Sequence, residues 1–403
     1  MTGTQKLVRN MPSHLQDWIA RRPSGVTQND FILGALESAH KTGYQPTLFE
    51  GHRPVHDSSD LPRFIDLFAG IGGFRIGMEA NGFDCVWTSE IDKFARTTYQ
   101  AWFGEEEIQA DINDPELDLA NIPDHEVLCG GFPCQPFSIA GVSKKNSLGR
   151  KHGFDDEQKG NLFFRICEIV DVKRPPVLFL ENVKNLRSHD KGNTWRVIQE
   201  QLQDRNYVVF DKTIDAKAWV PQHRERIFIV AFDRDIFGDE PGFEFPNAPI
   251  QEAPLLGSIL EKKVDPKYTL SDKLWQYLQD YAAKHKAAGN GFGYGLVGPK
   301  DVTRTMSARY YKDGSEILIR QRGKKNPRRL NYRESALLLG YTDELAAIYG
   351  HENGFPQAVS DTQAYKQFGN SVVPLVVREI AAEIAKVIKA SASAGVDDAV
   401  SAA

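Results

Sequence analysis

The chain has 403 residues, of which 41% are hydrophobic and 26% are charged, so it can bury a large core and is long enough for two or three domains. Its longest unbroken apolar run is the six residues 227–232, far short of the ~20 that a membrane span needs. The first 30 residues contain charges and no apolar block, which argues against a secretory signal. We therefore expect a cytoplasmic protein with no membrane partner.

The charge is informative only when it is mapped along the chain. A formal net charge of −5 argues weakly against a polyanionic partner. Residues 300–333, however, hold eleven Lys and Arg against three acids, a local net charge of +8, and Lys144, Lys145, Arg150 and Lys151 form a second cluster without acids. Such patches can bind phosphates, but a solvated charged face explains most charge runs. Charge alone leaves nucleic-acid binding open.

The elements expected in chain order indicate an α/β protein. Residues 1–62 form a polar N-terminal extension of unknown role, with one helix around residues 29–41. From 63 to 245, short apolar segments alternate with longer amphipathic stretches, which predicts a doubly wound, mostly parallel sheet with helices on both faces. The expected strands are 64–68, 85–90, 126–131, 176–182, 207–212 and 226–232.

The pattern weakens after Pro246. Residues 246–327 are rich in Gly, Lys, Arg and Tyr and predict a smaller, irregular domain. A helical pattern returns over 328–388, and we expect this segment to complete the first domain. The small, unpatterned residues 389–403 predict a disordered tail.

A glycine-rich loop follows the first strand, with Gly70, Gly72 and Gly73 in a G-x-G-G spacing that differs from the dinucleotide fingerprint. Glycine lets backbone N–H groups approach a ligand closely. Glu90 stands at the end of the next strand, where doubly wound folds hold a ribose hydroxyl, and Asp111 follows the third helix. Together these residues favour an adenosine ligand without a pyrophosphate, S-adenosylmethionine rather than NAD; the alternative is a tight turn that binds nothing.

Cys134 differs from the other three cysteines, Cys85, Cys129 and Cys167, which lie in apolar patterns typical of buried, inert thiols. Pro133 and Pro136 bracket it and prevent regular structure, so we expect an exposed loop at the carboxyl edge of the sheet. A thiolate at this edge is a candidate nucleophile; the alternative is a fourth buried cysteine. Four cysteines are too few for a disulfide framework, and no second pair completes a zinc site, so no metal is expected.

Two further motifs carry charged groups at strand ends. Glu181 and Asn182 end an apolar strand, and a partly apolar pocket would raise the pKa of Glu181 so that it could donate a proton. Arg224 and Arg226 alternate along a strand, so both can point to one face and offer donors to a carbonyl oxygen or a phosphate. The alternatives are a helix cap or surface acid for Glu181 and an ion pair with Glu225 for the arginines.

These segments resemble, in order, the motifs of the DNA (cytosine-5) methyltransferases. The matching segments are DLFAGIGGF (66–74), GFPCQPFS (131–138), ENV (181–183), QHRER (222–226), RRLNYRES (328–335) and QFGNSVVP (367–374). Asn331 stands where the family usually has Thr. The resemblance covers residues 63 to about 388, and the segments 289–297 and 303–319 resemble those of Dcm-type bacterial enzymes, which act on short CC-containing palindromes.

The resemblance implies the fold of S-adenosylmethionine-dependent methyltransferases and a role for each matched residue. Cys134 would attack C6 of a flipped-out cytosine, Glu181 would bind its N3 edge, and Arg226, helped by Arg224, would hold O2. The methyl group of S-adenosylmethionine would pass to C5, leaving S-adenosylhomocysteine. The implied cofactor-binding residues are Phe68, Ala69, Gly70, Ile71, Gly72, Gly73, Glu90, Ile91, Asp111, Ile112, Leu162, Asn370 and Ser371.

Double-stranded DNA is the expected partner, held between the catalytic domain and residues 246–327 as a target-recognition domain. The expected DNA-binding residues are Gln135, Ser138, Lys144, Lys145 and Arg150 in the loop after Cys134, and Arg304, Arg309, Arg320 and Arg322 in the recognition domain. We expect a monomer associated with the bacterial nucleoid while it is bound to DNA. A cognate restriction endonuclease would be a separate chain, and the sequence leaves open whether one exists.

Three rival functions make different predictions. An RNA cytosine-5 methyltransferase on this scaffold would have a short recognition insert, whereas this insert has about 100 residues and is basic. An amino-methyltransferase would need an acid-Pro-Pro-aromatic tetrapeptide, which we do not find. A non-catalytic DNA-binding regulator would have lost Cys134 or Glu181, and both are present.

Overall fold

A computed structural model describes residues 61–104, 107–133, 162–250, 252–289 and 293–401. The chain divides into two units, Met1–Gly51 and His52–Ala403, and all described residues lie in the second. The expected N-terminal helix lies outside the described residues. The same holds for Cys134 and for the loop residues Gln135, Ser138, Lys144, Lys145 and Arg150.

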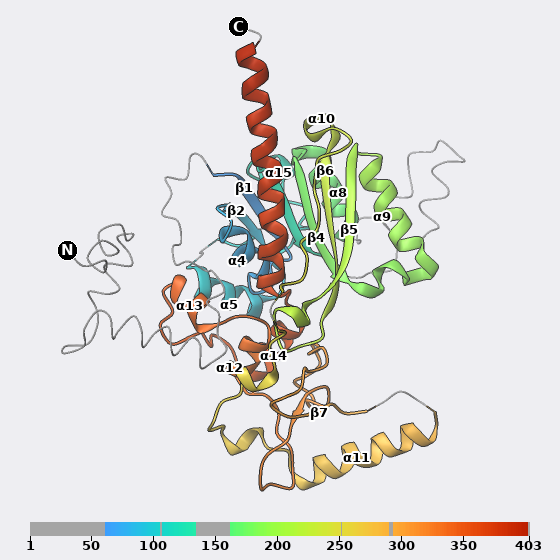
Figure 1. The fold of residues 1–403 in the computed structure, drawn as a ribbon, viewed down its shortest axis with the longest axis vertical. Helices are drawn as coiled ribbons and strands as arrows, with labels where there is room; N and C mark the ends of the chain where they lie inside the picture. The colour runs from blue at the N-terminus through green and yellow to red at the C-terminus, as the bar shows by residue number, and fades with distance from the viewer. Residues whose placement is uncertain (1–60, 105–106, 134–161, 251, 290–292, 402–403) are drawn as a thin grey trace, which may run out of the picture. The chain divides into compact units, whose positions relative to one another are not determined.

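A six-stranded sheet forms the centre of this unit (Figure 1). Its strands are β1 (Arg63–Leu67), β2 (Asp84–Ser89), β3 (Val127–Gly131), β4 (Val177–Val183), β5 (Tyr207–Asp215) and β6 (Glu225–Asp233), in the order β2-β1-β3-β4-β6-β5. Neighbours from β2 to β4 pair in parallel, whereas β6 runs antiparallel to both β4 and β5. All six expected strands and the α/β class are confirmed.

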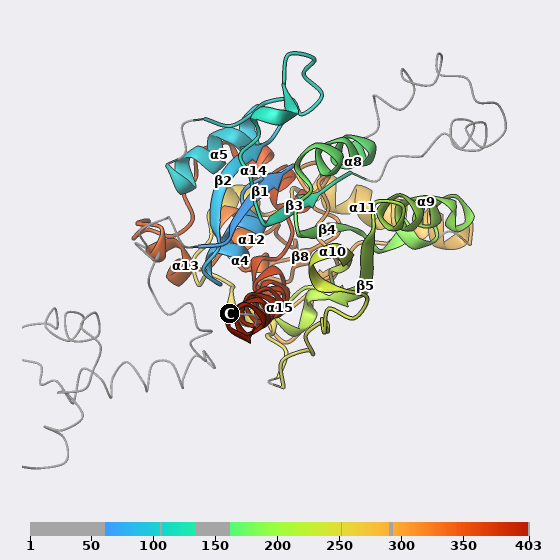
Figure 2. The same cartoon turned by 90° about the horizontal axis from the view of Figure 1, so that it is seen from above.

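Helices cover both faces of the sheet (Figure 2). On one face, α8 (Leu162–Lys173) and α9 (Asn193–Gln203) pack on a core that includes Leu67, Leu128 and Ile229. On the other face, α4 (Gly73–Glu79) packs against α15 (Pro374–Ser401). The remaining helices of this region are α5 (Lys93–Phe103) and α10 (Arg234–Phe237), with 3-10 turns at Leu119–Asn121, Lys184–Arg187, His189–Gly192 and Ala216–Ala218.

The reversal of β6 determines what meets at the carboxyl edge of the sheet. Parallel strands bring their carboxyl ends to one edge, so the ends of β1, β3 and β4 lie together. Because β6 is antiparallel, its amino end reaches the same edge, and Val183 of β4 is paired with Arg226. Gly131 at the end of β3 is paired with Glu181. The four motif segments therefore converge there, although they are far apart in the sequence.

Residues 246–327 contain more regular structure than expected. They include α11 (Asp272–Ala287), a short parallel pair β7 (Leu296–Val297) and β8 (Leu318–Ile319), and 3-10 turns at Leu256–Ser258 and Pro266–Tyr268. Ser271 caps α11 by accepting a hydrogen bond from the Leu274 amide, and Trp275 and Leu278 bury one face. The segment for which a smaller, irregular domain was expected therefore contains one regular helix, and the helical spacing of these apolar residues was the available signal.

The C-terminal part contains α12 (Tyr332–Leu338), α13 (Asp343–Ile348), α14 (Asp361–Asn370) and α15. Helix α15 continues to Ser401 and so covers most of the segment for which a disordered tail was expected. The reason is compositional: this stretch is rich in alanine, which has the highest helix propensity. Within the described ranges, no helix combines the length and apolar character required to cross a membrane.

Asp66 places a carboxyl group inside this sheet. It lies in β1 between Thr88 of β2 and Cys129 of β3 and is fully buried. Burial is the main cause that raises the pKa of Asp66 to about 8, and nearby Arg75 on α4 opposes the shift. The folded protein therefore binds this proton more tightly than the unfolded chain does.

We predict that Asp66→Asn changes how stability depends on pH. The folded-state pKa is raised, so this group's contribution is fully present below its unfolded pKa near 3.8 and is lost as the pH rises to about 8. Wild type should therefore lose free energy of unfolding relative to Asp66→Asn, by up to about 1.4 kcal/mol per pH unit in that range. Urea unfolding at several pH values measures this, with the exposed Asp204→Asn as control; a constant difference between wild type and Asp66→Asn contradicts it.

Candidate active site

The glycine-rich loop is strained in a way that requires its glycines. Gly70 and Gly72 have positive φ angles of 58° and 84°. A Cβ at Gly72 would lie 2.2 Å from Cε2 of Phe103, so a larger residue would collide with α5. Phe68 also has a positive φ, 56°, which is uncommon for a non-glycine residue. The loop thus holds a backbone conformation typical of ligand-binding turns.

Glu90 is joined directly to this loop. Its carboxylate accepts hydrogen bonds from the Gly70 amide at 2.8 Å and from the Asp92 amide at 2.7 Å. The pKa of Glu90 is nevertheless raised, chiefly by burial, while the two backbone donors oppose the shift. A carboxylate has about four acceptor positions, so Glu90 can still accept hydrogen bonds from a hydroxyl pair.

The segment around Asp111 lies beside the end of β2. Glu90 donates its amide to the Gln109 carbonyl at 3.0 Å, and Gln109 forms a parallel bridge with Ser89. The Asp111 carboxylate accepts from the Asn113 amide at 2.8 Å. Ile112 is buried in the core against which Leu162 packs, whereas Ile91 is 68% exposed. Glu90 and Asp111 therefore both lie near the carboxyl end of β2. The exposed side chain of Ile91 can cover a ligand bound there.

The C-terminal return reaches the same loop. A Cβ on Gly73 would lie 2.6 Å from Cγ1 of Val372, so this segment packs on the glycine-rich loop. The Ser371 hydroxyl lies 2.7 Å from the Tyr341 hydroxyl, and Asn370 is exposed at the end of α14. The sequence alone did not reveal a further link, the Lys366–Asp92 ion pair at 2.9 Å, which joins α14 to the start of α5.

Glu181 is paired with Gly131 at the end of β3, three residues before Cys134 in the sequence. One of its carboxylate oxygens would be 3.2 Å from a Cβ on Gly131, so Glu181 packs closely on this glycine. Asn182 donates to the Phe132 carbonyl at 2.8 Å. Cys134 itself lies outside the described residues. Gly131 and Phe132, which precede it in the chain, contact Glu181 and Asn182.

Arg226 forms an ion pair with Glu181, with Nε 2.9 Å from Oε1. Both side chains are largely buried, with 16% and 12% of their surfaces exposed. Burial raises the pKa of Glu181, and Arg226 and then Arg224 oppose the shift. The pair leaves a carboxyl that can hold a proton and a guanidinium with further donors at one small site, which suits a heterocycle with adjacent nitrogen and carbonyl groups.

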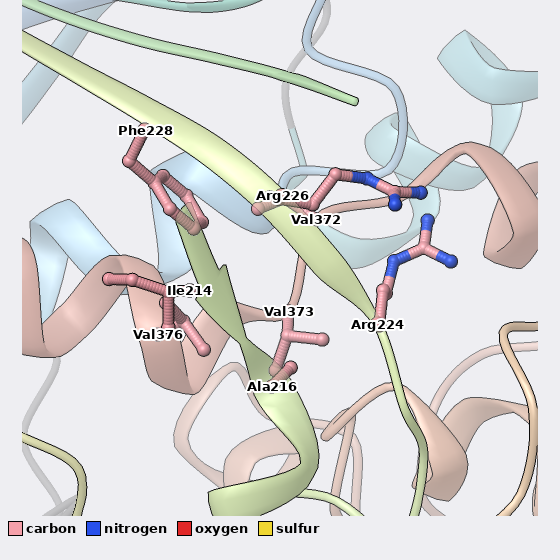
Figure 3. Close-up of a pocket in the computed structure, with 8 residues that line it drawn as sticks. All are labelled: Ile214, Ala216, Arg224, Arg226, Phe228, Val372, Val373 and Val376. Atoms are coloured by element: carbon pink, nitrogen blue, oxygen red, sulfur yellow. The ribbon is translucent and has the colours of Figure 1, made fainter. Parts of the chain in front are cut away.

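Arg224 has different partners from those expected. It is 1% exposed, and its guanidinium donates to the backbone carbonyls of Met306 at 3.0 Å, Gly369 at 2.9 Å and Ser371. Burial, and then the charge of Arg226, lower its pKa to about 9. The two guanidinium groups lie near each other beside a small apolar pocket (Figure 3), which Ile214, Ala216, Phe228, Val372, Val373 and Val376 also line. Arg224 precedes the first residue of β6, where these three carbonyls converge.

The four arginines that were expected to bind DNA from residues 246–327 are all exposed. Arg304 donates to the Gly293 carbonyl at 2.8 Å, and Arg320 lies 3.5 Å from an Asp301 oxygen. Arg309 and Arg322 lie on the surface of the same domain. Among the described residues, no group of three or more His, Cys, Asp or Glu side chains is arranged to hold a metal ion.

Comparison with known proteins shows the family to which this chain belongs. The sequence model of the C-5 cytosine-specific DNA methylase family matches residues 62–386. The chain belongs to this family. As a cytosine-5 DNA methyltransferase, it is 45% identical over 378 residues to the DNA-cytosine methyltransferase of Escherichia coli K12, covering 81% of this chain and 78% of that one. It is 48% identical to the type II methyltransferase M.NlaX of Neisseria lactamica, covering 81% and 97%.

The fold of this methyltransferase is also found in solved structures. A mutant of DNMT2 from Spodoptera frugiperda matches with a TM-score of 0.59 and 18% identity, covering 81% of this chain and 99% of that one. Dnmt2 methyltransferase of S. pombe matches with a TM-score of 0.58 and 16% identity, covering 81% and 98%. At these identities the likeness shows the shared α/β methyltransferase fold alone.

Proposed function

We propose that this enzyme methylates C5 of one cytosine within a short, CC-containing palindrome of double-stranded DNA, with S-adenosylmethionine as the methyl donor. The observation that carries the proposal is the Glu181–Arg226 pair beside the chain leading to Cys134. The pair offers groups that match the N3 and O2 positions of cytosine. Cys134, three residues beyond Gly131, supplies the nucleophile that this chemistry requires.

The residues of the loop region fit an adenosine cofactor. The positive-φ backbone at Gly70 makes room for a close approach, the carboxylate of Glu90 provides a ribose acceptor, and the exposed side chain of Ile91 provides an apolar cover. Phe68, Asp111, Ile112, Leu162, Asn370 and Ser371, with Ala69 and Ile71–Gly73 of the loop, would complete the pocket. When bound, S-adenosylmethionine supplies an electrophilic methyl group.

The reaction follows from the roles of the chain's own residues. The Cys134 thiolate forms a bond to C6 of cytosine, and protonated Glu181 donates a hydrogen bond to N3 while Arg226 holds O2. Electron density thereby gathers at C5, which would accept the methyl group that S-adenosylmethionine supplies, with the electron pair of the broken C–S bond remaining on the sulfur of S-adenosylhomocysteine. Loss of the C5 proton to a base then expels the Cys134 thiolate and restores the ring. The target base must leave the duplex first, at a cost of a few kcal/mol.

The remaining assignments concern partners. We propose that the enzyme acts as a monomer on DNA in the bacterial cytoplasm and that Arg304, Arg309, Arg320 and Arg322 contact DNA from the recognition domain. Gln135, Ser138, Lys144, Lys145 and Arg150 would meet the strand around the flipped base. The names of relatives such as M.NlaX are those of type II enzymes, which supports a cognate endonuclease encoded as a separate chain.

We predict that wild type forms a covalent complex with DNA carrying 5-fluorocytosine at the target position when S-adenosylmethionine is present. Fluorine at C5 prevents the last elimination, so the Cys134–C6 bond should survive denaturing electrophoresis. Cys134→Ala should give no complex, whereas Arg196→Lys, on the exposed surface of α9, should behave as wild type. A complex of undiminished yield with Cys134→Ala would exclude this cysteine as the nucleophile.

A second prediction concerns pH. Because burial raises the pKa of Glu181, its protonated form persists to higher pH than that of an exposed glutamate, and kcat/KM should fall as the pH rises through this pKa. Glu181→Gln keeps a donor without titrating, so it should lose this fall in kcat/KM, with a rate lower by about 10²–10⁴. Steady-state methylation over a pH series tests both; an unchanged profile in the glutamine variant would show that another group titrates.

A further inference from the structure

The segment Pro221–Arg224 binds a short stretch of the recognition domain as an additional strand would. Thr303 donates its amide to the Pro221 carbonyl and accepts from the His223 amide, both at 2.9 Å. Gln222 is fully buried, and its side chain accepts from the Met306 amide at 2.8 Å. The recognition stretch Thr303–Met306 is therefore fixed by backbone and buried side-chain bonds to the residues that precede β6.

Arg224 extends this attachment to the cofactor side. Its guanidinium binds the Met306 carbonyl on one side and the Gly369 and Ser371 carbonyls on the other. The two segments also touch directly, because a Cβ on Gly369 would lie 2.2 Å from the Ala308 nitrogen. One fully buried side chain thus joins the recognition stretch to the C-terminal return.

Both ends of this connection lead to functional groups. On the cofactor side, Val372 packs on Gly73 of the glycine-rich loop. On the catalytic side, Arg226 follows Arg224 by two residues in the chain and pairs with Glu181. A displacement of the Gly369–Ser371 carbonyls would therefore move Arg224, and with it the recognition stretch and the start of β6.

We infer that Arg224 is a positioning residue that couples the cofactor pocket to the recognition domain, so that cofactor and DNA each strengthen the binding of the other. The inference rests on the proposed function. Cofactor bound against Ser371 restrains the carbonyls that hold Arg224, and Arg224 restrains Met306. Coupling between two ligands is reciprocal, so it can be measured from either side.

The test compares the dissociation constant of a duplex containing the methylated site with and without S-adenosylhomocysteine. For wild type we expect the cofactor product to tighten DNA binding at least about fivefold. Arg224→Lys keeps the charge but offers one ammonium in place of a fork, so it should reduce this factor to below about two. Gly369→Ala, which changes no polar group but pushes Ala308 away, should do the same. Arg196→Lys is the matched control and should retain the wild-type factor.

A measurement on the wild type alone tests the inference even if the variants fail to fold. Without DNA, S-adenosylhomocysteine should slow hydrogen exchange at the Thr303 and Met306 amides by at least about threefold, although neither lies in the cofactor pocket. Unchanged exchange at these amides would overturn the inference. So would a folded Arg224→Lys that keeps the wild-type factor while its kcat falls as much as in Arg226→Lys, since that pattern marks a direct contact with the base. A wild type that methylates no DNA would instead contradict the proposed function.

Discussion

The ion pair between Glu181 and Arg226 is the interaction on which the proposed catalytic centre depends. Both side chains are largely removed from water, and such a pair recovers through attraction roughly what its burial costs, so it adds little to stability. The importance of the pair is that it fixes the positions of the two side chains relative to each other. It exists because β6 runs against the direction of β4, which brings the amino end of one strand to the carboxyl end of the other.

The same reversal gathers the other segments at this edge. Residues 221–224, just before β6, receive the recognition stretch at Thr303–Met306, and Arg224 adds the C-terminal return at Gly369–Ser371. A buried guanidinium bound to neutral carbonyls is costly unless these acceptors stay in place. The placements of the Glu181–Arg226 pair, of the C-terminal return and of the stretch Thr303–Met306 are therefore interdependent, as the proposed reaction of two substrates at one site would require.

The sequence predicted the sheet well because its strands are apolar runs bounded by turn residues, as in 176–182. It also indicated which strand ends carry buried acids, since Glu181 and Glu90 follow apolar runs directly, and their catalytic and cofactor-binding roles stay predictions. Helix α11 was not expected, although its buried Trp275 and Leu278 have the spacing of one helical face. The sequence also could not separate the roles of Arg224 and Arg226. Alternation along a strand gives both a common direction, but only the fold shows that carbonyls from Met306 and Gly369 occupy Arg224.

The most direct test of this account is methylation-sensitive sequencing of unmethylated DNA after treatment with the protein and S-adenosylmethionine. The account predicts 5-methylcytosine at one position of a single short motif, and none with Cys134→Ala. The same experiment supplies the recognition sequence, which neither the motifs nor the exposed arginines reveal. A folded wild type that binds S-adenosylmethionine yet leaves every cytosine of the DNA unmodified would contradict the account.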